Sequence, residues 1–136
     1  MQIRKFRESD RADVIALWRR CDLVRPQNNP DQDIDLKLTF QPDQFLVGEI
    51  DNSVAGTVMA GYEGHRGWVN YLAVDPDVQR GGLGERLMAE AERLLRDLGC
   101  VKINLQVRSR NENVQEFYSS IGFSRDDVIS MGKRLK

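Results

Sequence analysis

The segment 68–107 constrains the fold most, because it passes through three different local patterns. Residues 68–74 form an apolar run that ends at an Asp-Pro pair and indicates a buried strand. Apolar residues then recur at spacings of three and four over 83–98, which predicts an amphipathic helix that Gly99 terminates. Residues 101–107 alternate apolar and polar and predict another strand. Two strands joined through a helix should run parallel, as a βαβ unit.

Antiparallel strands and further helices are expected before this unit. Residues 2–6 alternate as a short first strand, and a helix with one apolar stripe should end near Cys21. Residues 34–40 suggest a short second helix, although their period is ambiguous. Two apolar runs, 45–50 and 53–59, then flank a two-residue turn and predict a β-hairpin.

The C-terminal part predicts one more helix and closing strands. Ser109 and Glu112 form a possible capping box for a helix that extends through Ser120, and 127–134 are expected to supply one or two strands. The fold class is therefore α+β, with a mixed, mostly antiparallel sheet of about six or seven strands flanked by about four helices. A chain of 136 residues suits one domain, 1–136.

Composition excludes several classes of function. Twenty basic residues against 21 acidic residues leave a net charge of −1, which argues against nucleic acid as the partner. A polar N-terminus and the lack of any apolar run near 18 residues argue against a signal peptide and a membrane span, so we expect a cytoplasmic protein. The two cysteines and one histidine are too dispersed for a metal site, and no metal is expected.

The glycine-rich turn 79–84 is suited to bind an anion. Glycines let successive N–H groups point into one concavity, and the helix that follows adds partial positive charge, which together suit a pyrophosphate. The alternative is a tight turn that binds nothing. A Walker loop is excluded because Glu85 and Arg86 stand where its lysine and hydroxyl residue belong. A dinucleotide motif would need a third glycine where Leu87 stands.

Two ordered motifs resemble the GNAT superfamily of acetyltransferases. Gln79-x-x-Gly82-x-Gly84 looks like the acetyl-CoA pyrophosphate loop of that superfamily. Downstream, Asn111-x-x-Val114-x-x-x-Tyr118, with Gly122-Phe123 after it, is similar to a second conserved segment. The stretches 18–23, 64–67 and 132–135 further resemble YpeA-type bacterial members.

The resemblance implies a site and a reaction. The strand before the loop would splay from its parallel neighbour, and its backbone would hydrogen-bond the acetyl carbonyl and pantetheine of acetyl-CoA. A primary amine would attack the thioester directly in a ternary complex. The acceptor is a small molecule or a protein N-terminus or lysine. The residues expected to contact acetyl-CoA are Leu72, Ala73, Val74, Gln79, Arg80, Gly81, Gly82, Leu83, Gly84, Asn111 and Tyr118.

Tyr118 resembles the tyrosine that protonates the departing thiolate in many members. Its alternative role is a core aromatic residue, and Asn111 can contact the cofactor or cap its helix. Two branches of the superfamily carry a catalytic glutamate where Gln106 and Trp68 stand here, so neither base is present. Glu63, in a loop, is a candidate base that works through water.

Substrate contacts and partners follow from the same resemblance. Arg25, Asn28 and Asn29 occupy the region that shapes the acceptor site, although such segments are usually plain turns. A homodimer through the C-terminal strands would be common for an enzyme of this size. The alternative function is a non-catalytic module that senses acyl-CoA or serves as an assembly subunit.

Overall fold

The computed structural model describes the backbone of residues 1–136 and every side chain except that of Arg80. The chain forms two compact units, Met1–Leu105 and Gln106–Lys136. The first contains a sheet and three α-helices, and the second contains one α-helix, α4 (Glu112–Ser120), and the C-terminal residues. None of the described helices combines the length and the apolar character that a membrane crossing requires.

The sheet has five strands in the order of the sequence. They are β1 (Gln2–Lys5), β2 (Phe45–Ile50), β3 (Ser53–Tyr62), β4 (Gly67–Val74) and β5 (Ile103–Asn104). The first four pair antiparallel, whereas β4 and β5 pair parallel. The parallel pair confirms the predicted βαβ unit, because α3 connects its two strands.

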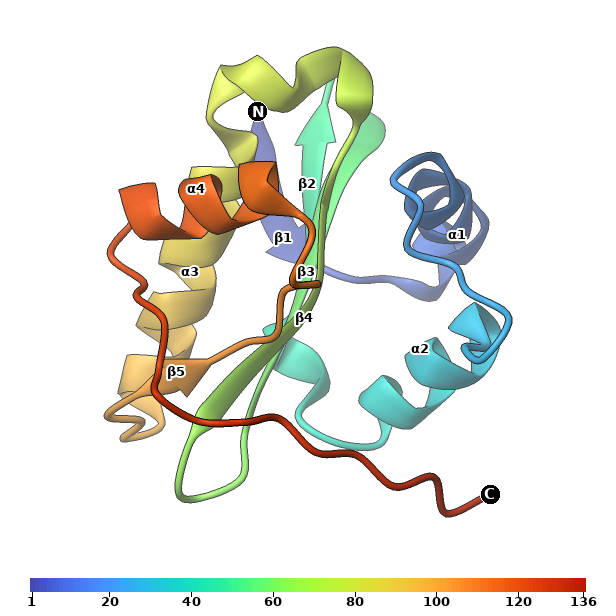
Figure 1. The fold of residues 1–136 in the computed structure, drawn as a ribbon. Coiled ribbons are helices and arrows are strands. Elements are labelled where there is room, and N and C mark those ends of the chain that lie inside the picture. The colour runs from blue at the N-terminus through green and yellow to red at the C-terminus, as the bar shows by residue number, and fades with distance from the viewer. The chain divides into compact units, whose positions relative to one another are not determined.

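Helices cover both faces of this sheet (Figure 1). α1 (Arg11–Arg20) and α2 (Pro30–Leu38) lie on one face, and α3 (Leu83–Asp97) lies on the other. Glycine lets α3 approach closely, since a Cβ on Gly48 would stand 2.8 Å from a methyl carbon of Leu83. The core between the sheet and the α1–α2 layer consists of Val14, Leu17, Trp18, Ile34, Phe45, Val47, Met59 and Ala73.

The predicted hairpin is present, and its turn has the expected chemistry. Asp51 and Asn52 both have positive φ angles, 50° and 63°, which a tight hairpin turn requires and which these residue types tolerate. The second helix begins earlier than predicted, at Pro30, because Asn29 caps it: the Asn29 side chain accepts a hydrogen bond from the backbone N–H of Gln32.

The prediction of six or seven strands is wrong for the described residues, which form five. The predicted strand 101–107 shrinks to Ile103–Asn104, and the tail 127–134 forms no strand. A strand needs a partner ladder and a buried face, and the tail gains neither. Its apolar side chains are largely exposed, from 77% for Val128 to 91% for Met131.

The predicted capping box at Ser109 is also wrong. α4 begins at Glu112, and the side chain of Asn111 accepts a hydrogen bond from the backbone N–H of Val114, 3.2 Å away. Asparagine competes well as an N-cap because its short side chain reaches the free N–H groups of the first turn. Of the two predicted roles for Asn111, capping is the one seen in this unit.

Candidate functional site

A β-bulge interrupts the pairing of β4 with β3. Thr57 pairs with Ala73 and Met59 pairs with Asn70, so Tyr71 and Leu72 together face Val58. Tyr71 has a φ of +53°, a left-handed conformation that is unusual for an aromatic residue. Bulges of this kind redirect side chains and free backbone groups from a ladder, and they are common beside active sites.

A side-chain network from α1 holds the bulge. The indole Nε1 of Trp18 donates to the hydroxyl of Thr57 at 2.9 Å, and that hydroxyl donates to the carbonyl oxygen of Tyr71 at 2.8 Å. The rings of Trp18 and Tyr71 are stacked with their centroids 3.8 Å apart. Trp18 and Thr57 are both fully buried. These contacts offset the strain at Tyr71.

The phenol of Tyr71 reaches α2. Its hydroxyl donates to Oδ2 of Asp33 at 2.5 Å. Burial, and then the carboxylate of Asp33, raise the pKa of the Tyr71 phenol above its usual range. Both side chains are only partly buried. The bulge therefore carries a phenol–carboxylate pair that a solute can reach.

Lys37 lies one turn after Asp33 on α2. Its ammonium group donates to the carbonyl oxygen of Ala60 on β3. Burial lowers the pKa of Lys37 to about 8, because an apolar surrounding disfavours the charged form. We call Asp33, Lys37 and Tyr71 the α2 cluster. Sequence reasoning missed all three residues, and only the i, i+4 spacing of Asp33 and Lys37 hinted at a shared helix face.

The glycine-rich turn follows β4 directly. A 3₁₀ turn spans Pro76–Gly81, and the side chain of Asp75 caps it by accepting from the N–H of Asp77 at 3.0 Å. Gly82 then has a φ of +77° and precedes the first residue of α3. A Cβ on Gly81 or Gly82 would meet nothing within 4 Å. Both glycines are exposed and lead directly into the first turn of α3, whose free N–H groups suit an anion.

The end of β4 and this turn are linked by side chains. Gln79 donates from Nε2 to the carbonyl oxygen of Val74 at 3.2 Å, and the thiol of Cys21 donates to the same oxygen at 3.3 Å. Ala73 is buried, and Leu72 belongs to the bulge. The predicted cofactor segments 72–74 and 79–84 are thus linked by a hydrogen bond from Gln79 to Val74 across the intervening residues 75–78. The side chain of Arg80 lies outside the described residues.

β4 is paired on its β5 side only at its first two residues. Gly67 pairs with Ile103 and Trp68 pairs with Asn104, and β4 then continues to Val74 without a β5 partner among the described residues of this unit. Backbone groups on that edge are available to a ligand. The early end of the pairing agrees with the predicted splay of the two strands.

The second unit contains two of the predicted residues, Asn111 and Tyr118. Tyr118 is 9% exposed, and its ring contacts those of Phe117 and Phe123 edge to face at 5.2 Å and 5.5 Å. Burial raises the pKa of the Tyr118 phenol to about 12, so the phenol is protonated at neutral pH. Gln106 donates to the hydroxyl of Ser130.

Glu63 lies in the turn between β3 and β4. Its carboxylate accepts from the backbone N–H of Arg66 at 2.6 Å, which shapes the turn. That turn is at the Tyr62–Gly67 end of the hairpin, about 13 Å along the strand from Tyr71 at roughly 3.3 Å per residue. Glu63 and the bulge are therefore not brought together.

The predicted substrate residues precede α2. Arg25 donates from Nη2 to the carboxylate of Asp22 at 3.1 Å, and its Nε is buried without a hydrogen-bond partner among the described atoms. The backbone N–H of Asn28 donates to the carbonyl oxygen of Arg25 at 2.9 Å. Asn29 is the N-cap of α2. Turn formation and capping thus account for Asn28 and Asn29 locally.

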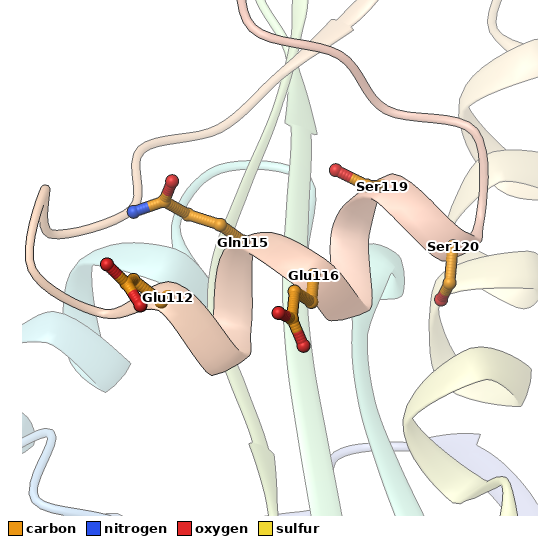
Figure 2. Close-up of a pocket in the computed structure, with 5 residues that line it drawn as sticks. All are labelled: Glu112, Gln115, Glu116, Ser119 and Ser120. Carbon is orange, nitrogen blue, oxygen red and sulfur yellow. The ribbon is translucent and has the colours of Figure 1, made fainter.

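A hollow in the second unit is lined by one face of α4 (Figure 2). Figure 2 shows its lining residues, which are Glu112, Gln115, Glu116, Ser119 and Ser120. Their spacing of three and four places them on neighbouring turns of the helix. None of the predicted site residues is among them.

The five-stranded mixed sheet, its bulge and the glycine turn before α3 are the features of an α+β fold of the GNAT type. The sequence model of the acetyltransferase (GNAT) family matches residues 11–123. The chain belongs to this family.

A relative agrees with this assignment, and solved structures share the fold. An acetyltransferase of Pectobacterium atrosepticum is 46% identical over 135 residues, which cover 99% of this chain and 96% of the relative. The crystal structure of Ard1 from Thermoplasma volcanium has a TM-score of 0.77 at 25% identity and covers 90% of this chain and 82% of Ard1. The structure of AAC(6')-Iy with a CoA bisubstrate analogue has a TM-score of 0.76 at 19% identity, with coverage of 98% and 97%.

Proposed function

We propose that this acetyltransferase moves the acetyl group of acetyl-CoA to a primary amine by direct attack in a ternary complex. One observation carries the proposal: the edge of β4 that has no β5 partner among the described residues leads through a left-handed glycine, Gly82, to the N-terminus of α3, where no described side chain caps the helix. An extended thiol ester with a pyrophosphate needs such a row of backbone donors. The acceptor is a small molecule or a protein N-terminus or lysine.

Backbone groups would hold most of acetyl-CoA. The N–H groups of Gly81, Gly82, Leu83 and Gly84 would bind the pyrophosphate, with Gln79 and Arg80 beside them. Backbone groups of residues 72–74 would bind the pantetheine arm and polarise the acetyl carbonyl, which stabilises the oxyanion that forms on attack. The solved AAC(6')-Iy structure, which contains a CoA bisubstrate analogue, supports a CoA ligand on this fold.

Tyr118 would donate the proton that the departing thiolate needs. The Tyr118 phenol is protonated at neutral pH, so it can donate its proton as negative charge develops on the departing sulfur. Asn111 would support this role indirectly, by capping the helix that carries Tyr118. Both assignments stay predictions.

The remaining predictions are less directly supported. Glu63 stays a candidate base through water, and Arg25, Asn28 and Asn29 stay candidate substrate contacts. A single domain over 1–136 is supported by a family match that includes parts of both compact units. The homodimer loses its stated basis, because the described tail forms no closing strands.

The test combines binding with turnover. Acetyl-CoA and CoA should each raise the melting temperature of the purified protein. Thiol release from acetyl-CoA with a panel of primary amines should then fall at least about a hundredfold in Tyr118→Phe, because a positioned acid contributes about that much. Tyr62→Phe is the matched control, since its hydroxyl only donates to the carbonyl oxygen of Gly64 in a turn.

Two results would change the assignment. No thermal shift with either ligand would exclude the acetyl-CoA site. Binding without any turnover that depends on Tyr118 would favour the alternative, a non-catalytic module that senses acyl-CoA or serves as an assembly subunit.

A further inference from the structure

α2 carries three aspartates at alternate positions, and one of them, Asp33, has a different partner from the other two. Arg11 binds the carboxylates of Asp31 at 3.3 Å and Asp35 at 2.7 Å on the outer side of the helix. Asp33 instead meets the phenol of Tyr71 at the sheet. Among the described residues, Asp33 takes part in no ion pair. Its hydrogen-bond donor is the neutral Tyr71 hydroxyl, and the lysine one turn later on α2, Lys37, donates to the carbonyl oxygen of Ala60 instead.

The surroundings of Asp33 leave room for a cation. Tyr71 occupies one carboxylate oxygen, Oδ2, and a carboxylate accepts hydrogen bonds at both oxygens. Asn70 and Trp68 pair with Met59 and Gly61, so they lie on the same sheet face as the α1–α2 layer. Asn70 is exposed and Trp68 is 40% exposed. This part of the face is therefore open to a solute.

We propose that Asp33 binds the acceptor amine as its ammonium ion and positions it beside the bulge in β4. The ammonium group passes one proton to solvent water before the neutral amine attacks the thioester. This inference rests on the proposed acetyl transfer, because the bulge residues precede the backbone groups that would hold the acetyl carbonyl. A charge-assisted hydrogen bond to a carboxylate is the strongest contact available to an ammonium group.

The position of Asp33 is set by the same network that forms the bulge. Trp18 stacks on the Tyr71 ring, and the Tyr71 hydroxyl then fixes the carboxylate. Asp33 and the backbone that would bind the acetyl group are thereby both positioned by the bulge in β4. A purely structural role for Asp33, tying α2 to β4, is the alternative that an experiment must separate.

The first experiment compares Asp33→Asn with Asp35→Asn. Asparagine still accepts the hydrogen bond from Tyr71 but lacks the charge, and Asp35 is a matched aspartate on the same helix. With the best primary amine of the thiol-release panel, Asp33→Asn should raise the KM for the amine at least about tenfold. The KM for acetyl-CoA should stay within about twofold, and Asp35→Asn should match wild type. Equal KM values for the amine in the two variants would overturn the proposal.

A second measurement does not depend on turnover. The side-chain carboxyl carbons are followed by NMR in the CoA-saturated protein while n-butylammonium chloride is added. The Asp33 signal, assigned from its absence in Asp33→Asn, should shift and saturate while the Asp35 signal stays. The neutral analogue 1-butanol should leave both unchanged. A stationary Asp33 signal up to the solubility limit of the amine would overturn the proposal.

The two proposals fail in different ways. If acetyl-CoA binds and turnover depends on Tyr118 while Asp33→Asn behaves as wild type, only the Asp33 proposal is wrong. If acetyl-CoA does not bind, the proposed function is wrong, and the amine titration of the CoA-free protein still decides whether Asp33 binds ammonium groups.

Discussion

The bulge of β4 and the glycine-rich turn that follows it are neighbours in sequence but are built from different groups. The bulge depends on side chains from three elements, with Trp18 from α1, Asp33 from α2 and Thr57 from β3 around Tyr71. The turn joins two exposed glycines, Gly81 and Gly82, to the first backbone N–H groups of α3. One region can therefore select an acceptor by side-chain chemistry, whereas the other can bind a constant group through the main chain.

This difference has a physical basis. A pyrophosphate needs several donors in a small volume, and the start of a helix supplies them from consecutive residues. An amine needs an acceptor of opposite charge at one position, and neighbouring elements must converge to place it. Substitutions should therefore act on the two regions in separable ways.

The largest loss of stability is expected at Thr57, the fully buried residue that supports the bulge. Thr57→Val keeps the shape of the side chain but leaves the Trp18 indole without an acceptor and the Tyr71 carbonyl without its hydroxyl donor. The free energy of unfolding should fall by about 3 kcal/mol, since each unpaired buried group costs about 1–3 kcal/mol. Denaturant unfolding measures it. Thr57→Ser, which keeps the hydroxyl, should lose less than about 1 kcal/mol; similar losses in both would mean that packing, not hydrogen bonding, holds the bulge.

The glycine turn can be tested by comparing two glycines that both have a left-handed backbone conformation. Gly82 and Gly99 have φ angles of +77° and +91° and flank the two ends of α3. Alanine at either position should cost about 1–2 kcal/mol of stability, the penalty of a left-handed conformation. Only Gly82→Ala should also weaken acetyl-CoA binding, by at least about tenfold in a calorimetric titration. Equal affinities in the two variants would remove the turn from the cofactor site.

Lys37 should make the α2 cluster sensitive to alkaline pH. Its pKa is lowered to about 8 in the folded protein, against about 10.4 in the unfolded chain, so the unfolded chain binds more protons between these values. The Lys37 contribution to stability should therefore rise with pH from about 8 to 10. The gain in the free energy of unfolding over this pH range should be about 1 kcal/mol, because the partial exposure of Lys37 weakens the effect of burial on its charge. The difference between wild type and Lys37→Met over this range isolates it, and a flat difference would contradict the shift.

The smallest effect is expected at the ion pair that joins α1 to the start of the turn. Arg20 donates to the carboxylate of Asp75 at 3.0 Å, and the arginine side chain is 47% exposed. Arg20→Ala should change stability by no more than about 0.5 kcal/mol and acetyl-CoA affinity by less than about twofold. Arg19→Ala, next to it, is the control. A much larger loss for Arg20→Ala in either assay would show that the two regions are coupled through α1.

Local patterns predicted much of the fold, and they also single out one half of the proposed site. The periodicity of 83–98 and the Asp51-Asn52 turn depend on neighbours in sequence, and both elements are present. The glycine-rich turn was recognised because a backbone site needs only a short continuous segment. The closing strands predicted for 127–134 are absent, since a strand needs a partner ladder that a local segment does not supply.

The amino-acid sequence by itself determined the βαβ unit, the glycine turn and the family, because each depends on consecutive residues or on ordered motifs. Only the tertiary structure decided the bulge and the α2 cluster. The φ angle of Tyr71 has no local signal, and Asp33 is one of three aspartates that look alike in sequence. What separates it is the helix face that packs on β4, and packing between distant segments is set by the whole fold.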